Sequence, residues 1–357
     1  MADNSSIEWT DTTWNVALGC DRVSSGCDGC YAIPQAHIRA SNPHPKVAAA
    51  FAGLTTRTSD RLDWTGKVNL IEERLNQPFA WRNPRKVFVN SLADLFHDKI
   101  PADFISDVFA VMALTPQHTY QILTKRHGPM RSLLNKQAFW YQVGRKARHL
   151  GYSNSRAANH LGDGSNIYDT AQWETRRHLP NVWLGVSVED QKHADLRIPA
   201  LLETPAAVRW ISAEPLLGPV ILRDDWMGAD PYRRDEPSLA WVVAGGESGP
   251  KARPMHPSWP RDLRDQCQAA GIAFLYKQWG EWWPQPRYNT DDRHHVVMVN
   301  GMDRGTPWPG WGLDQPDAEV MERVGKKRAG RLLDGREWNE FPQEVAATGA
   351  ACSEGAL

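Results

Sequence analysis

A chain of 357 residues can form one large α/β barrel with insertions, so its length does not require two domains. It contains no run of about 18 uninterrupted apolar residues, which excludes a membrane-spanning helix. The net charge of −1 excludes overall attraction to nucleic acid, so such contact would need a local patch. The N-terminus lacks the basic start and apolar run of a secretory signal, and we therefore expect a cytoplasmic protein without a membrane partner.

Eight short runs rich in Val, Ile, Trp and Phe recur along the chain, and a helix-length segment follows most of them. This alternation is typical of a parallel sheet with crossover helices. Eight strands predict a (β/α)8 barrel or a partial TIM-like barrel. The expected strands are residues 13–18, 67–70, 86–90, 119–123, 182–188, 208–212, 241–244 and 272–276.

Two segments between these strands have the pattern of helices that pack on a sheet. Residues 101–114 carry apolar side chains at 104, 105, 108, 109 and 112, which lie on one face of a helix. In residues 258–270, Trp259, Leu263 and Cys267 are four apart, so we expect Cys267 to lie in the core.

The remaining segments divide the chain into a barrel and its additions. We expect the barrel over residues 1–280, with a helical insertion at about 128–180 that either shapes substrate access or is a variable surface excursion. Residues 281–345 are polar and rich in Pro and Gly, and we expect them to form a C-terminal extension packed on the barrel. Residues 346–357 have too little apolar bulk to order themselves and are predicted to form a disordered tail.

Three of the five cysteines, Cys20, Cys27 and Cys30, lie within eleven residues of one another. An odd number of cysteines in a reducing compartment argues against a disulfide framework. Clustered thiolates select zinc or iron–sulfur clusters, and a [4Fe–4S] cluster bound by three thiolates keeps one iron free for a substrate or cofactor. The alternative is a structural zinc site in which His37 provides the fourth ligand.

Motifs over nearly the whole chain accompany the cysteines. They include Gln121-Ile-Leu-Thr-Lys-Arg126, Ser212-Ala-Glu-Pro-Leu-Leu-Gly-Pro219, Gly245-Gly-Glu-Ser-Gly-Pro250 and the segments 7–15, 87–97, 182–190, 277–281 and 330–338. With these motifs the chain resembles a phage-type family of three-Cys-motif proteins, which in turn resembles the radical S-adenosylmethionine (SAM) superfamily. The resemblance implies a radical SAM-type barrel with a cluster loop at residues 20–30.

The chain departs from the superfamily pattern in two places. The superfamily spacing is Cys-x3-Cys-x2-Cys, whereas six residues separate Cys20 from Cys27 here. The Gly-Gly-Glu triplet of the superfamily follows the second strand, whereas Gly245-Gly246-Glu247 belongs to the seventh predicted strand. We therefore do not transfer the role of that triplet, which is to bind the methionine amino group.

Polar and charged residues stand at the carboxyl ends of most of the predicted strands. In α/β barrels these ends form the working face, so we expect the side chains to converge on one mouth. The simpler interpretation, that polar residues merely end apolar strands, holds for any single one of them. The residues are Asn90, Asp94, Lys125, Arg126, Ser187, Glu189, Glu214, Glu247 and Lys277.

The resemblance implies roles for these residues. Ser187 and Glu189 would contact the adenosine of SAM, and Lys125 or Arg126 would pair with its carboxylate. The full set expected to bind the cofactor is Asn90, Asp94, Lys125, Arg126, Ser187 and Glu189. The residues expected to be catalytic are Glu214, Glu247 and Lys277.

Two functions follow from these expectations. The first is an enzyme that uses a cluster reduced by flavodoxin or ferredoxin to form a 5′-deoxyadenosyl radical from SAM. Its expected substrate, by analogy with the phage-type family, is a nucleic-acid base, a nucleotide or a nucleotide precursor. The second is a non-catalytic protein, stabilised by zinc or a cluster, that binds nucleic acid or a protein partner.

Overall fold

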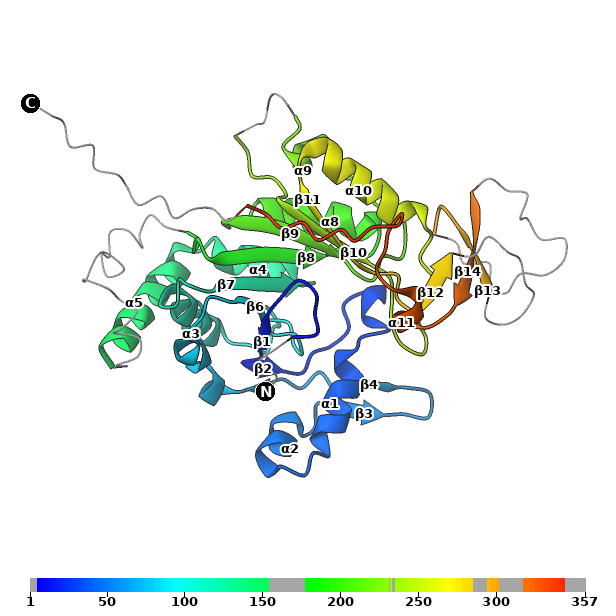
Figure 1. Cartoon of the computed structure of the whole chain (residues 1–357). Helices are drawn as coiled ribbons and strands as arrows, with labels where there is room; N and C mark the ends of the chain where they lie inside the picture. The colour runs from blue at the N-terminus through cyan, green and yellow to red at the C-terminus, as the bar shows by residue number, and fades with distance from the viewer. Residues whose placement is uncertain are drawn as a thin grey trace, which may run out of the picture.

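The core of the protein is a seven-stranded parallel sheet that curls into a half-barrel (Figure 1). The computed structural model describes residues 5–153, 177–230, 232, 235–284, 294–301 and 317–343. The order of the strands in the sheet is β1-β6-β7-β8-β9-β10-β11. Their bounds are Thr12–Trp14 (β1), Lys86–Val89 (β6), Thr119–Thr124 (β7), Val182–Ser187 (β8), Val208–Ala213 (β9), Trp241–Gly245 (β10) and Ala273–Gln278 (β11).

The structure confirms a partial TIM-like barrel and corrects one predicted strand. Within residues 67–70 the chain forms only β5 (Asn69–Leu70), which pairs antiparallel with β2 (Ala17–Leu18) outside the main sheet. The predicted first strand, residues 13–18, divides into β1 and β2. The Asn90 side chain accepts hydrogen bonds from the backbone N–H groups of Val16 and Ala17, so these groups do not continue the pairing of β1 with β6. The main sheet therefore has seven strands and stays open.

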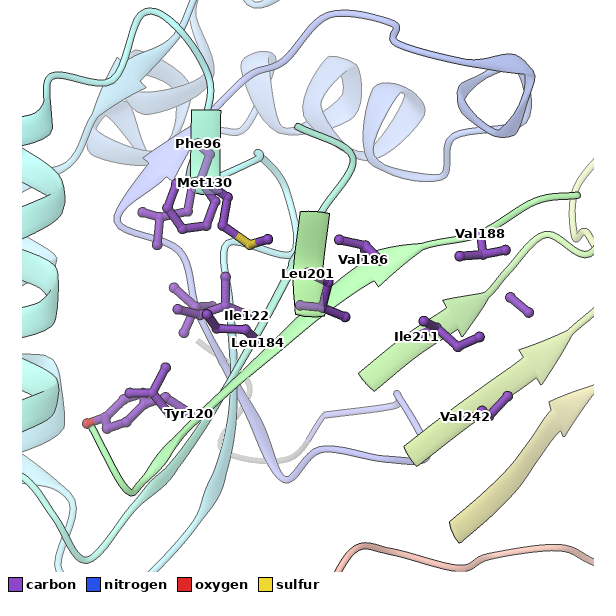
Figure 2. Packing of buried hydrophobic residues seen from close by; sticks show 14 of the residues in the cluster. Phe96, Tyr120, Ile122, Met130, Leu184, Val186, Val188, Leu201, Ile211 and Val242 are labelled. Atoms are coloured by element: carbon purple, nitrogen blue, oxygen red, sulfur yellow. The ribbon is translucent and has the colours of Figure 1, made fainter. Parts of the chain in front are cut away.

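The outer face of the sheet packs against helices. Side chains of alternate strand residues, among them Ile122, Leu184 and Ile211, lie in the main hydrophobic core. Figure 2 shows them beside Met130 and Leu201, which come from the covering helices. These helices are α3 (Ala102–Ala113), α4 (His127–Leu134), α8 (Gln191–Leu202) and α10 (Ser258–Ala270). The predicted helices at 101–114 and 258–270 are thus confirmed, and Cys267 is fully buried in the core.

The inner face of the sheet is filled by tryptophans near the amino ends of the strands. Trp183, Trp210 and Trp241 project from β8, β9 and β10 and form a separate buried cluster with Trp9. The ring centroids of Trp9 and Trp210 are 5.2 Å apart, and those of Trp210 and Trp241 are 5.1 Å apart. We call these four residues the aromatic floor. Because side chains alternate along a strand, residues two and four positions further on face the same side beyond this floor.

The other elements surround the half-barrel. The long helix α5 (Gln137–Ser153) follows α4 in the region of the predicted insertion and packs on α3. The region 281–345 contains an antiparallel sheet of β12 (Trp282–Pro284), β14 (Ala318–Arg323) and β13 (His294–Met298), followed by α11 (Lys326–Ala329). The predicted tail at 346–357 lies outside the described residues. None of the helices in the described parts of the chain is long and apolar enough to cross a membrane.

Several short elements complete the fold. A satellite unit next to β2 contains two helices and a hairpin with their own small hydrophobic core (Figure 1). Its elements are α1 (Ala32–Ala40), α2 (Pro45–Phe51), β3 (Thr55–Arg57) and β4 (Leu62–Trp64). The remaining turns of helix are η1 (Ser25–Cys27), η2 (Glu72–Arg74), η3 (Gln77–Ala80) and α9 (Asp224–Met227).

Candidate functional site

Residues 20–30, which we call the cysteine loop, join β2 to α1 and carry the three predicted metal ligands. Burial, helped by the charge of Asp94, raises the pKa of the Cys20 thiol to about 12, although the Arg126 charge acts in the opposite direction. Burial also raises the pKa of Cys30, with a contribution from the charge of Cys27. Charge interactions thus link Cys30 with both Cys20 and Cys27, and burial disfavours the thiolates of Cys20 and Cys30 unless a cation compensates for it.

The arrangement of the thiols differs from that of a closed zinc site. In the described part of the chain, the side chains of Asp21, His97 and Asp98 have ligand atoms that all lie within 4.8 Å of one another, whereas the three cysteines form no such group. Sulfurs around one zinc ion lie about 3.8 Å apart, given Zn–S bonds of about 2.3 Å. The predicted fourth ligand, His37, instead contacts the Thr55 hydroxyl through Nδ1 at 3.2 Å.

Glu189, beyond the end of β8, attaches the cysteine loop to the sheet. Its fully buried carboxylate lies 3.0 Å from Lys125 Nζ and 2.8 Å from Arg197 Nη1, and it accepts a hydrogen bond of 2.7 Å from the Ser24 hydroxyl. Burial alone would raise the pKa of Glu189, but these partners lower it to about 2. A Cβ at Gly26 would lie 2.4 Å from Glu189 Cγ, so the loop approaches this carboxylate as closely as a glycine allows.

Glu247, beyond the end of β10, makes the second attachment. It accepts hydrogen bonds from Arg253 Nε at 2.8 Å and Nη2 at 2.7 Å. The same guanidinium donates to the carbonyl of Ser25 at 2.9 Å. A Cβ at Gly29 would lie 2.5 Å from Glu247 Oε1. We call Glu189 and Glu247 the loop anchors, because each packs against one glycine of the cysteine loop.

Asp94 and Arg126 lie beside the first cysteine. The Asp94 carboxylate accepts hydrogen bonds from the Thr124 hydroxyl at 2.7 and 2.9 Å and from the Lys125 amide at 3.0 Å. Arg126 Nη1 lies 3.6 Å from Asp94 and 3.7 Å from the sulfur of Cys20, and its guanidinium also pairs with Asp21. Arg126 is thus a cation in direct contact with a thiol of the loop.

Glu214 and Lys277 form a separate ion pair at the ends of β9 and β11. Lys277 Nζ lies 2.9 Å from Glu214, and the Ser212 hydroxyl donates to the same carboxylate at 3.2 Å. Burial would lower the pKa of Lys277, but the charges of Glu214 and Glu8 raise it above its usual value. The pair therefore places a protonated amine and a carboxylate side by side on the inner face.

The two remaining predicted residues have backbone partners. Asn90 adopts a positive φ of 59°, and its Oδ1 accepts hydrogen bonds from Val16 and Ala17 at 3.0 and 3.2 Å. Its side chain therefore holds the turn between β1 and β2. Ser187 is buried, and its carbonyl accepts a hydrogen bond of 2.8 Å from Arg197.

The structure brings most of the predicted residues to one edge of the sheet. Asp94, Arg126 and the loop anchors surround the cysteine loop, and Lys125 pairs with one of the anchors. Sequence reasoning missed Arg197 and Arg253, which neutralise the anchors. Searching the ends of strands could not find them, since Arg197 lies in helix α8 and Arg253 in the loop that follows β10.

Comparison with known proteins gives one match. A family model described as a protein of unknown function (DUF5131) matches residues 4–342. No curated protein and no solved structure matches the chain.

Proposed function

The chain belongs to the DUF5131 family, whose function is unknown, and we propose that it is a [4Fe–4S]-dependent enzyme of the radical SAM type. One observation carries the proposal: three thiols, linked by charge interactions through Cys30, lie in one loop that is anchored to the carboxyl edge of a parallel half-barrel. This edge is where α/β barrels hold reactive groups.

The residues present fit a cluster held by Cys20, Cys27 and Cys30. All three thiols are partly buried, and Arg126 beside Cys20 offsets part of the effect by which burial raises the pKa of that thiol. When bound, such a cluster with one free iron supplies the electron that cleaves SAM. A soluble reductant such as flavodoxin or ferredoxin is the proposed electron donor, in a cytoplasmic setting.

The hydrogen-bond pattern refines the roles of the acidic residues. Glu189 and Glu247 have their carboxylates occupied by cations of this chain, so we assign them to holding the loop. Glu214 and Lys277 stay as the proposed catalytic pair, since together they can hold or transfer a proton at a substrate atom. Lys125 and Ser187, on the same edge, stay as proposed SAM contacts.

For the substrate we propose a nucleic-acid base, a nucleotide or a nucleotide precursor, by analogy with the phage-type family. A nucleobase edge carries both hydrogen-bond donors and acceptors. The Glu214–Lys277 pair offers one acceptor and one donor to such an edge. Glu214→Gln and Lys277→Met should therefore weaken substrate turnover while leaving the metal content unchanged.

Anaerobic purification tests the proposal. We expect brown protein with about four irons and four sulfides per chain, a reduced EPR spectrum that changes when SAM is added, and slow release of 5′-deoxyadenosine. Cys27→Ala should lose the iron, whereas the matched control Cys267→Ala, at a buried thiol outside the loop, should keep it. A colourless protein with one zinc, or a cluster whose spectrum ignores SAM, would contradict the proposal.

A further inference from the structure

Two stretches of the chain, residues 249–253 and 323–331, carry an excess of positive charge that the chain as a whole lacks. Together they contain seven Lys and Arg residues and no Asp or Glu, although the net charge of the protein is −1. A protein of this net charge needs such a local excess if it is to bind nucleic acid. We call the two stretches the basic surface.

Hydrogen bonds join the two stretches. Arg323 Nη2, at the end of β14, donates to the carbonyls of Gly249 at 2.9 Å and Pro250 at 2.7 Å. The carboxylate of Glu281 accepts a hydrogen bond of 3.1 Å from the Gly249 amide, and the Glu281 carbonyl accepts one of 3.0 Å from the Gly325 amide. Helix α11 begins directly after Gly325 and lies beside β12 (Figure 1). The two stretches therefore form one continuous part of the surface.

Most of the cations of the basic surface have no carboxylate to neutralise them. Two of the seven do, since Arg253 pairs with Glu247, and Arg331 Nε lies 3.9 Å from Glu337. Among the residues that the structure describes, no carboxylate pairs with the other five, which are Lys251, Arg323, Lys326, Lys327 and Arg328. All of these except Arg323 are exposed. Four exposed cations are therefore free to contact an anionic partner.

The basic surface adjoins the edge of the sheet that holds the proposed catalytic pair. Arg253, at the end of the first stretch, donates to the Ser25 carbonyl of the cysteine loop at 2.9 Å. Ser248, directly before this stretch, accepts a hydrogen bond of 2.8 Å from Gln278, the residue that follows Lys277 in β11. A strand whose phosphates lie on the basic surface therefore passes next to the catalytic pair.

We propose that the basic surface binds the phosphate backbone of a nucleic-acid strand and so presents one of its bases to Glu214 and Lys277. Several cations together neutralise a row of phosphates, and the four exposed side chains provide them. This inference rests on the proposed function, and it narrows the substrate from a base, a nucleotide or a precursor to a polymer. Anionic lipids also present phosphates, but they offer no base to the catalytic pair.

Binding of labelled oligonucleotides to the full-length chain tests the proposal. The probes are oligo(dT) and oligo(U) of about 20 nucleotides, long enough to cover one binding surface, and fluorescence anisotropy measures their affinity over a range of salt concentrations. We expect both the affinity and its salt dependence to be strong, and the better of the two probes identifies the strand as DNA or RNA.

Removal of the α11 cations should weaken this binding. Each phosphate contact on a single strand contributes about 0.7 to the slope of log K against log salt concentration. Lys326→Gln, Lys327→Gln and Arg328→Gln together should therefore reduce the slope by about 2 and lower the affinity about 100-fold at about 0.1 M salt. Addition of Lys251→Gln should reduce both further, because Lys251 belongs to the same surface.

A matched triple variant separates this surface from the effect of overall charge. Lys46→Gln, Arg57→Gln and Lys136→Gln together remove the same charge at exposed residues elsewhere, and they should leave the affinity and the slope nearly unchanged. All six residues are exposed, so both triple variants should fold. The proposal is overturned by equal affinity of the wild type and the α11 variant, by equal losses in both variants, or by tighter binding to phosphatidylglycerol vesicles than to either oligonucleotide.

The binding test and the cluster assignment can fail separately. Cys27→Ala should bind the oligonucleotides as the wild type does, because the basic surface contains no cysteine. A protein that binds the strand but holds no cluster would contradict the proposed enzyme and keep the basic surface. A protein that holds a cluster and cleaves SAM but does not bind either strand would keep the enzyme and overturn the basic surface.

Discussion

A single buried carboxylate, Glu189, joins three parts of the chain. It pairs with Lys125 after β7, with Arg197 in α8 and with Ser24 in the cysteine loop. A buried charge with two cationic partners is costly to disturb, because removing it leaves the partners buried without compensation. The residue should therefore matter for stability as much as for any ligand.

Replacement of Glu189 tests this role through its pH dependence. Glu189→Gln should lower the free energy of unfolding at pH 7 by about 3–5 kcal/mol. The pKa of Glu189 is about 2 in the folded protein and about 4.3 when unfolded. The native carboxylate therefore stabilises the fold fully above about pH 4.3, and this contribution is lost as the pH falls towards 2.

Urea denaturation of both proteins at several pH values measures the effect. The difference between wild type and Glu189→Gln should be constant from pH 6 to 8 and should shrink below about pH 4. A difference that grows as the pH falls would show that Glu189 is protonated in the native state.

At the scale of elements, the cysteine loop depends on two glycines for its close approach to the anchors. Gly26→Ala places a Cβ 2.4 Å from Glu189 Cγ. The Glu189 side chain can move away from this Cβ only by losing contacts with Lys125, Arg197 or Ser24. We expect a loss of about 1–3 kcal/mol in stability, together with lower iron content after anaerobic reconstitution. Gly128→Ala is the matched control, because nothing lies within 4 Å of its added Cβ. Equal iron content in both variants would mean that the loop does not need this contact.

The elements also show how far the sequence predicts the fold. Apolar runs identified all seven strands of the sheet, because strands buried on both faces have a strong pattern. Residues 67–70 have a similar pattern, but only Asn69 and Leu70 form a strand, and they pair with β2 instead of β6. Composition does not reveal the partner of so short a strand.

The candidate site was predictable to a similar extent. The spacing of the cysteines and the strand-end rule located the loop and both anchors. The ion-pair partners were not predictable, since Arg197 and Arg253 reach the anchors from a helix and a loop. The sequence alone therefore predicts that the carboxylates of Glu189 and Glu247 contact a ligand. In the structure these carboxylates pair instead with cationic side chains of the same chain.

At the scale of the whole molecule, the aromatic floor closes the inner face at the amino ends of the strands. Trp9 contributes from the N-terminal segment, and its ring centroid lies 4.7 Å from that of Phe88 and 5.2 Å from that of Trp210. Trp9→Ala should cost about 3–5 kcal/mol of stability through the cavity that it leaves. Thermal denaturation measures this loss. Tyr141→Ala, at a half-exposed aromatic residue, should change the stability by less than about 0.5 kcal/mol.

The two loop anchors lie beyond β8 and β10, and β9 runs between these strands. The cysteine loop, tied at both places, therefore crosses over the end of β9, where Glu214 lies. The substrate proposed for Glu214 and Lys277 would lie beside this crossing segment. Changes in the loop then alter two properties together, namely how the thiols are held and how easily a molecule enters and leaves. If the proposed enzyme function holds, a change of substrate range made within the loop would also disturb the three cysteines, so new specificities should arise more readily from residues outside the loop.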